Sequence, residues 1–351
     1  MMEVTFQSSQ IATLSGMTNF QKKSFEELFF QTARSNHLPE IIYLSCLSKG
    51  FPLKDSFLNY YIHKEKSDEF RTLCEFADIH FNELTIQNII LKELRDKNFV
   101  QSLLELTCDP ICDTSISDVM NKCFQINDFD EVIRAALRRE IYMSRGTRME
   151  NGIINKLASS LAENKKVNNC DFTIKVTRCS EKMKRELLPF LPDEKGNINK
   201  IFIVGKTDVH YEVSDAKDEL MPKVFYGEIK NRISNNKWPT SIDNQLQVMF
   251  YMFLYETEMM ILISHYPDGS IDRNMIKWDD TLFEKASSEL KKFACCYFDN
   301  IRKIKKTMTD NKRDEEPSEE ERGAISVFMK AQISKRKDEI QRGIKHTIKL
   351  L

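Results

Sequence analysis

The sequence predicts a mixed α/β (α+β) fold, with an all-helical N-terminal region ahead of an α/β core. Two patterns support this prediction. In residues 1–130, apolar side chains recur at three- and four-residue intervals, which is the period of an amphipathic helix. From residue 131 onward, short runs rich in β-branched and aromatic residues alternate with helical stretches. Of the 351 residues, 41% are hydrophobic and 30% are charged, a composition typical of globular proteins.

The N-terminal region, residues 1–130, shows helical periodicity in segments such as KKSFEELFFQTARS and LTIQNIILKELRD. We expect breaks between helices at the sequence KGFP, which ends at Pro52, and at Asp109-Pro110, because glycine and proline interrupt helices. The region contains no glycine-rich phosphate loop and no repeat of fixed period. The sequence therefore assigns no role to this region.

The second part of the chain predicts a domain over residues 131–308. It begins with two helices that meet near residues 144–146. The elements expected after them are strands at 172–179, 200–213 and 223–230, a helix from about Ser241 to Glu256, strands at 259–266 and 270–278, and an amphipathic helix at 281–304. This order of helix, three strands, helix and strand indicates an α/β core. Residues 309–351 are expected to form an acidic linker, 312–323, and a basic helical tail.

Charge and cysteine content narrow the class of protein. A formal net charge of −1 argues against a protein that coats nucleic acid through bulk charge, but it permits an enzyme with a local basic groove. The nine cysteines are scattered and lack the spacing of a zinc site, which favours a reducing compartment, nucleus or cytoplasm. The apolar run VMFYMFLY is far shorter than the roughly 20 residues of a membrane span, and the N-terminus does not resemble a secretory signal, so no membrane partner is expected.

Four polar residues stand out because each lies within an otherwise apolar stretch. They are Asp208, Glu228, Lys230 and Gln247. A charge in such surroundings is costly unless something binds it. Since side chains alternate along a strand, Glu228 and Lys230 are expected to share one face, with Ile229 pointing into the core on the other. A lone Glu-x-Lys is usually a solvated strand face, but the ordered set indicates a site.

This set of residues suits the hydrolysis of a phosphodiester. If the strands carrying Asp208 and Glu228 pair, their carboxylates come close together and their mutual repulsion favours a bound cation. Mg²⁺, or Mn²⁺ in its place, is commonly held by one or two carboxylates plus waters and substrate phosphate. The backbone carbonyl of Ile229 is expected to be a further ligand. The ammonium of Lys230 is expected to reach the attacking water or the phosphate.

The ordered motifs resemble those of the PD-(D/E)xK nuclease superfamily, in particular the phage-lambda-type exonuclease group, also called YqaJ-like viral recombinases. The similar segments are GTRME ending at Glu150, VGKTD ending at Asp208, EIK at 228–230 and NQLQ ending at Gln247. Gln247 together with Tyr251 also fits the Q-x3-Y form of related helicase-nucleases. The resemblance covers residues 131–306, about half of the chain.

The resemblance implies a restriction-endonuclease-like core with a mixed central sheet flanked by helices. It further implies that Asp208 and Glu228 bind metal and that Lys230 positions or activates the water. Glu150 would act from a neighbouring helix, and Gln247 would orient the network. The implied function is a metal-dependent deoxyribonuclease, an exonuclease acting on double-stranded DNA ends in recombination, repair or replication.

Contacts to DNA are expected from basic and aromatic residues near these motifs. The candidates are Arg145, Arg148, Lys206, Arg232, Lys237 and Trp238. The segment that would cradle a terminal 5′-phosphate is not recognisable, so the polarity of digestion stays open. Two alternatives also remain: an endonuclease of the same fold, and a catalytically inactive module that binds nucleic acid or protein. The sequence also leaves open whether the chain forms a homo-oligomer or binds a recombination partner protein.

Overall fold

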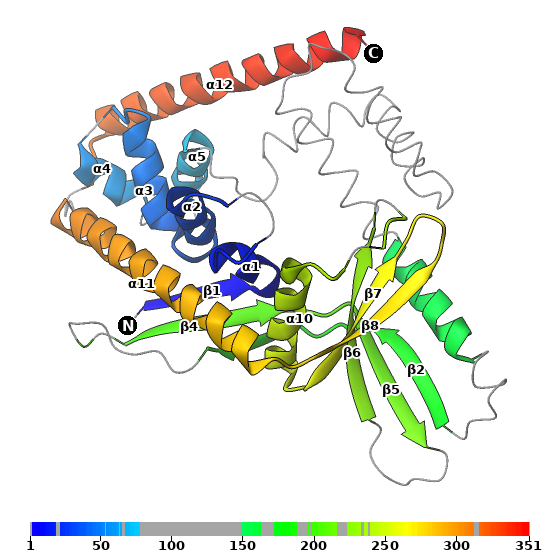
Figure 1. Cartoon of the computed structure of the whole chain (residues 1–351). Coiled ribbons are helices and arrows are strands. Elements are labelled where there is room, and N and C mark those ends of the chain that lie inside the picture. The colour runs from blue at the N-terminus through cyan, green and yellow to red at the C-terminus, as the bar shows by residue number, and fades with distance from the viewer. Residues whose placement is uncertain are drawn as a thin grey trace. The chain divides into compact units, whose positions relative to one another are not determined.

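The structure is a computed structural model that describes residues 2–18, 22–52, 54–62, 64, 67–77, 149–162, 172–187, 196, 198–215, 223–232, 235–237, 239–311 and 316–350. These residues form two compact units (Figure 1). The first, which we call the sheet unit, contains the described residues up to 23 and those between 149 and 294. The second, the helical unit, contains the described residues of 24–77 and of 295–350.

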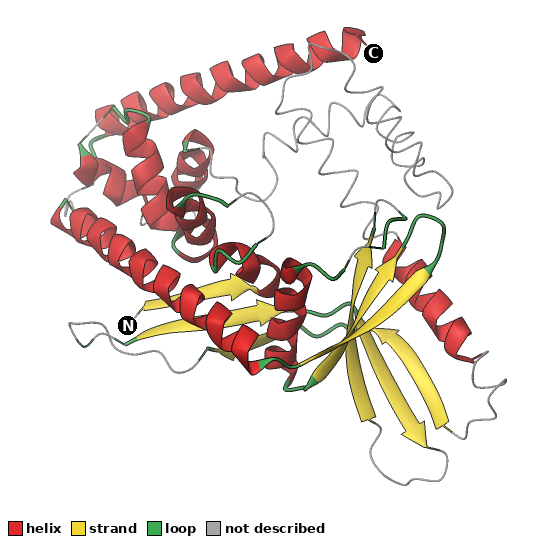
Figure 2. Cartoon of the chain, viewed as in Figure 1, coloured by secondary structure: helices red, strands yellow, loops and turns green. Residues whose placement is uncertain are grey.

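The sheet unit contains a three-stranded and a five-stranded sheet. The smaller sheet has the order β1 (Met2–Gln7), β4 (Asn199–Gly205), β3 (Met183–Glu186). The larger sheet has the order β2 (Phe172–Arg178), β5 (Val209–Asp215), β6 (Lys223–Asn231), β7 (Met259–His265), β8 (Ile271–Lys277). Within the larger sheet β6 and β7 are parallel, and the other neighbouring pairs are antiparallel. Among the described residues, strands occur in this unit alone (yellow in Figure 2).

Helix α10 (Ile242–Tyr255) connects β6 to β7, as a parallel pair of strands requires. It begins at Ser241, whose side chain accepts a hydrogen bond from the backbone N–H of Asn244, and it ends at Glu256 in the left-handed conformation, with φ of 52°. Most of its length from Leu246 to Leu254 is buried, because it packs against strands of both sheets as well as the N-terminal segment. That segment forms η1 (Ser8–Gln10) and α1 (Ile11–Leu14) after β1.

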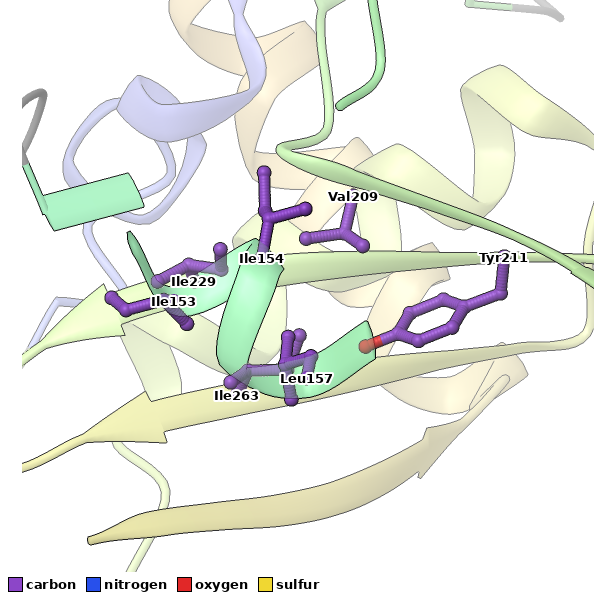
Figure 3. Close-up of a cluster of buried hydrophobic side chains, with 7 residues drawn as sticks. All are labelled: Ile153, Ile154, Leu157, Val209, Tyr211, Ile229 and Ile263. Atoms are coloured by element: carbon purple, nitrogen blue, oxygen red, sulfur yellow. The ribbon is translucent and has the colours of Figure 1, made fainter. Parts of the chain in front are cut away.

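A second helical segment, residues 149–162, covers one face of the five-stranded sheet. Its residues Ile153, Ile154 and Leu157 are spaced so that they lie on one side of a helix. As Figure 3 shows, they pack against Val209, Tyr211, Ile229 and Ile263 from three neighbouring strands. This contact places the beginning of the helical segment, with Glu150, on the sheet that carries β5 and β6.

The helical unit consists of α2 (Phe25–Asn36), α3 (Leu38–Ser48), α4 (Asp55–Ile62), α5 (Asp68–Phe76), α12 (Glu319–Leu350) and the second half of α11 (Asp280–Asp310). Ser24 and Glu27 form a reciprocal capping box that starts α2. Helix α12 packs on α5, where the rings of Phe76 and Phe328 are 5.7 Å apart. In the ranges that the structure describes, no helix combines enough length and apolar character to cross a membrane.

The structure confirms a mixed α+β fold, but it differs from the sequence prediction at several places. Residues 2–7 form a strand, so the N-terminal region is not all-helical; Val4 and Phe6 alternate with more exposed residues and are buried against β4 partners. The predicted strand 200–213 is two strands, β4 and β5, which belong to different sheets. The expected unit boundaries also change, because residues up to 23 join the sheet unit while residues 295–308 belong to the helical unit.

Candidate active site

Asp208 lies where the chain passes from the three-stranded sheet to the five-stranded sheet. Its backbone N–H donates to the carbonyl of Gly227 at 3.1 Å, and its carbonyl accepts from the N–H of Cys179 at 3.0 Å. Strand β5 pairs with β6 on one side and with β2 on the other, and these two bonds extend both pairings by one residue before Val209. Asp208 is thereby fixed opposite Glu228, as expected if the two motif strands pair.

The carboxylate of Asp208 is anchored to β6 as well. Its Oδ2 accepts a hydrogen bond of 2.8 Å from the backbone N–H of Ile229. Hydrogen bonds from backbone N–H groups to a carboxylate stabilise its charged form and restrict its orientation. The Ile229 side chain points the other way, into the cluster shown in Figure 3, which confirms the alternation expected for residues 228–230.

Glu228 and Lys230 form an ion pair on the opposite face of β6. The Lys230 Nζ donates to Glu228 Oε1 at 2.9 Å. The whole residue Glu228 is only 5% exposed. This ion pair is therefore largely removed from solvent, where the loss of either partner would be costly.

Gln247, from the second turn of α10, bridges the two members of this ion pair. Its Oε1 accepts from Lys230 Nζ at 2.7 Å, and its Nε2 donates to Glu228 Oε1 at 2.9 Å. The same Nε2 also donates to the hydroxyl of Tyr251 at 3.1 Å. Gln245, the other glutamine of the motif, instead donates to the carbonyl of Thr240 at 2.8 Å. The structure thus brings Gln247, and not Gln245, to the acids.

When no cation is bound, the surroundings of Glu228 favour its protonated form even though Lys230 stabilises the charged form. Removal from water is the main cause that raises its pKa to about 8, and the charge of Asp208 acts in the same direction, while Lys230 opposes both. Asp208 is also close enough to share a hydrogen bond with protonated Glu228. The second carboxylate oxygen, Oε2, is buried and has no hydrogen-bond partner among the described residues. A buried acceptor in this state is costly, so the site favours a proton or a cation here.

The donor atoms fit Mg²⁺ or Mn²⁺. Asp208 and Glu228 provide hard carboxylate oxygens that repel each other, and Oε2 of Glu228 lacks a partner in the described part of the chain. Within the same residues, no group of three or more His, Cys, Asp or Glu side chains is close enough to hold a metal ion. A cation held by two carboxylates and waters is usual for Mg²⁺, whereas a zinc site needs a fuller set of protein ligands.

Glu150, in the helical segment 149–162, lies close enough to Asp208 for their charges to interact. Its pKa is raised, first by burial and then by the charge of Asp208, while Arg178 and Lys206 lower it. Arg178 Nη2 donates to Glu150 Oε2 at 2.6 Å. Sequence reasoning missed Arg178, which is the last residue of β2. Arg178 precedes Cys179, whose backbone N–H donates to the carbonyl of Asp208. No feature of the sequence indicates this contact between strands, so the sequence could not identify Arg178.

The residues predicted to contact DNA differ in their surroundings, and only some of them belong to the described part of the chain. Lys206 is exposed and acts electrostatically on Glu150 beside the acids. Arg232 donates from Nε and Nη2 to the Ser264 hydroxyl at 3.1 and 3.0 Å, and Lys237 pairs with Asp272 at 3.0 Å. The remaining three candidates, Arg145, Arg148 and Trp238, lie outside the described residues. Of the described candidates, Lys206 is the one whose charge acts on Glu150.

Comparisons with known proteins do not assign a family. No family model and no curated protein matches the sequence. Among solved structures, the crystal structure of a protein called SSO0001 is 17% identical over a match that covers 60% of this chain and 87% of that chain, with a TM-score of 0.29. A TM-score this low supports no conclusion about fold or function.

Proposed function

We propose that this chain is a metal-dependent deoxyribonuclease with a restriction-endonuclease-like PD-(D/E)xK core, acting as an exonuclease on the ends of double-stranded DNA. The observation that carries the proposal is the network of Asp208, Glu228, Lys230 and Gln247. It combines two neighbouring carboxylates with a lysine that lies two residues after Glu228 on the same face of β6. One oxygen of Glu228 is buried and has no hydrogen-bond partner among the residues that the structure describes.

In this proposal, Asp208 and Oε2 of Glu228 hold Mg²⁺ or Mn²⁺, with the backbone carbonyl of Ile229 as a further ligand. When bound, the cation supplies charge neutralisation at the scissile phosphate and activation of a water molecule. The hydrogen bond from the Ile229 N–H holds Asp208 in place for this role. Because Lys230 and Gln247 both donate to Oε1 of Glu228, Oε2 is the oxygen of this carboxylate that would bind the cation.

Lys230 would position or activate the attacking water, or contact the phosphate. An ammonium has three hydrogens to donate, and Lys230 uses two of them on Glu228 and Gln247. These two bonds limit the directions that the third hydrogen can take. Gln247 therefore orients the lysine while it also restrains the carboxylate, which supports the role that the sequence motifs imply for it.

Glu150, Arg178 and Lys206 would border this centre. The contact of Arg178 with Glu150 balances the negative charge contributed by the three acids. The positive charges of Arg178 and Lys206 both act on Glu150, and they would attract a DNA phosphate at this place. The proposal that the enzyme acts on duplex ends rests on the resemblance of the motifs alone. An endonuclease of the same fold would instead cut closed circular DNA, which the following assay tests.

A cleavage assay on linear, nicked and covalently closed circular duplex DNA tests the proposal. We expect linear DNA to be degraded with Mg²⁺ or Mn²⁺ but not with EDTA, and closed circles to stay intact. Glu228→Gln and Lys230→Gln should each lower the rate by more than about 100-fold, because each removes a group placed at the reacting phosphate.

Lys200→Gln is the matched control, since Lys200 pairs with Glu186 at 3.2 Å on the three-stranded sheet, and it should retain the wild-type rate. Cleavage of closed circles would change the assignment to an endonuclease. If wild-type protein binds DNA but cleaves none of the three substrates, the nuclease proposal is wrong and a binding module remains.

A further inference from the structure

Ser8 is a buried polar residue that lies far from the motifs in sequence but is connected to them in space. It is 2% exposed and begins η1, directly after β1. Its hydroxyl lies next to Tyr251 of α10, where both side chains approach Gly205. Tyr251 in turn accepts from Gln247 Nε2 at 3.1 Å. A continuous set of contacts between polar side chains therefore connects the N-terminal segment to Gln247.

The position of Tyr251 is important because both N–H hydrogens of the Gln247 amide are engaged in hydrogen bonds. One N–H of its Nε2 is directed to Glu228 Oε1 and the other to the Tyr251 hydroxyl, while its Oε1 accepts from Lys230. An amide NH₂ has two hydrogens to donate. With Tyr251 in place, the amide presents its oxygen to the lysine and its N–H to the carboxylate, and it cannot rotate without leaving a donor unsatisfied.

Gly205 makes the contact between Ser8 and Tyr251 sterically possible. A Cβ at this position would lie 2.3 Å from Ser8 Oγ and 2.6 Å from Tyr251 Cε1. Both distances are far below van der Waals contact, so a side chain at 205 would displace one of the two residues. The end of β4 thus provides the space in which the Ser8 hydroxyl and the Tyr251 ring approach each other.

The N-terminal segment is anchored to the rest of the sheet unit at further points. Strand β1 pairs in parallel with β4, in a register that ends with Gln7 opposite Val204. Thr18 Oγ1 donates to Asp243 Oδ1 at 2.6 Å, in the first turn of α10. Helix α1 also packs along α10. The segment therefore holds the helix that carries Gln247 both at its start and at Tyr251.

We propose that Ser8 is a positioning residue of the candidate active site: through Tyr251 it fixes the amide of Gln247 and thereby the ammonium of Lys230. This inference rests on the proposed function for its consequence in catalysis. It makes the N-terminal residues 2–18 a working part of the nuclease unit, although the sequence assigned them no chemistry. Ser8 does not touch the substrate, so its effect should fall on kcat and leave the KM for DNA unchanged.

The kinetic test uses Ser8→Ala, Tyr251→Phe and the double variant on linear duplex DNA with saturating Mg²⁺. Loss of either hydroxyl should lower kcat by about fivefold to tenfold for each single variant, because the restraint on the Gln247 amide is weakened. The double variant should be no slower than Tyr251→Phe alone, because the two groups act in series. Ser15→Ala is the matched control: Ser15 is a buried serine of the same segment, but its hydroxyl donates to the carbonyl of Ala12. It should keep the wild-type kcat.

A second readout does not depend on cleavage. With glutamine labelled by ¹⁵N, the side-chain amide protons of Gln247 should exchange slowly with water in the wild type, and Gln247→Glu identifies their signals. Ser8→Ala should speed this exchange by about fivefold to tenfold, whereas Ser15→Ala should not. If Ser8→Ala does not fold, Ser8→Cys replaces it, because a thiol is only a weak donor.

The outcomes separate the two proposals. If wild-type protein cleaves no DNA but Ser8→Ala still releases the Gln247 amide, the proposed function fails and the connection from Ser8 to Gln247 stands. Unchanged amide exchange in Ser8→Ala overturns the inference, whatever the nuclease activity. So do a wild-type kcat in Ser8→Ala, or additive losses in the double variant.

Discussion

Glu228 is the residue whose surroundings depart most from those of a surface acid. Its place on one face of β6 with Lys230 could be predicted from strand alternation alone. Its burial could not, because the cover comes from α10 and neighbouring strands that meet only in the folded chain. The same holds for Arg178, whose bond with Glu150 joins the end of β2 to a separate helix. Sequence patterns identify which residues are unusual, whereas their partners depend on tertiary contacts.

The pKa of Glu228 predicts how the metal-free protein responds to pH. Because its folded pKa, about 8, lies above the ordinary 4.5, the protonated carboxyl stabilises the fold fully below about 4.5, and this contribution is lost as the pH rises through 8. Compared with Glu228→Gln, the wild type in EDTA should lose stability between these pH values, by on the order of a few kcal/mol. Urea unfolding of both proteins from pH 5 to pH 9 measures the difference. Parallel stability curves would contradict the buried, repelled state of this carboxyl.

At the scale of elements, several helices and strands could be predicted from the sequence, whereas other features of the sheets could not. The helix expected from about Ser241 to Glu256 is α10, and the strands expected near 223–230, 259–266 and 270–278 are β6, β7 and β8. The division of 200–213 into β4 and β5 was not predicted, since the run stays β-like throughout and its only strong turn residue is Gly205. The pairing of β1 with β4 was missed because it joins residues nearly 200 positions apart.

Gly205 gives a prediction at this scale, because it lies where β4 ends against α10. Gly205→Ala should lower the free energy of unfolding by about 1 to 3 kcal/mol, since its Cβ would overlap Ser8 Oγ and Tyr251 Cε1. Gly152→Ala, in the helical segment 149–162, meets nothing within 4 Å and should instead stabilise the protein by about 0.5 to 1 kcal/mol. Denaturant unfolding of the two variants checks both signs. A Gly205→Ala protein as stable as the wild type would show that the contact over this glycine is not tight.

At the scale of the whole molecule, each of the two units is formed by segments that are distant in the sequence. The sheet unit combines the N-terminal residues with 149–294, and the helical unit combines 24–77 with 295–350. A division made along the sequence, at residues 130 and 308, therefore could not reproduce the two units. The described residues of the candidate site belong to the sheet unit, and α12 packs on α5 in the helical unit.

This arrangement predicts that damage to the helical unit leaves the candidate site intact. Phe328→Ala removes the ring that meets Phe76, and should destabilise the α5–α12 packing by about 1 to 3 kcal/mol. Val327→Ala, at a side chain on the same helix that is 71% exposed, should change stability by less than about 0.5 kcal/mol. Hydrogen exchange should locate the loss of protection in α5 and α12. A weaker Mn²⁺ affinity in Phe328→Ala would contradict the independence of the site.

The central claim is that Asp208 and Glu228 together hold the divalent cation of a nuclease. Anomalous scattering from Mn²⁺ in crystals of the protein tests it most directly, at a Mn²⁺ concentration that supports DNA cleavage. We expect a Mn²⁺ peak in contact with both carboxylates, and its loss in crystals of Glu228→Gln. No peak at these carboxylates, or a peak that persists unchanged in Glu228→Gln, would contradict the assignment.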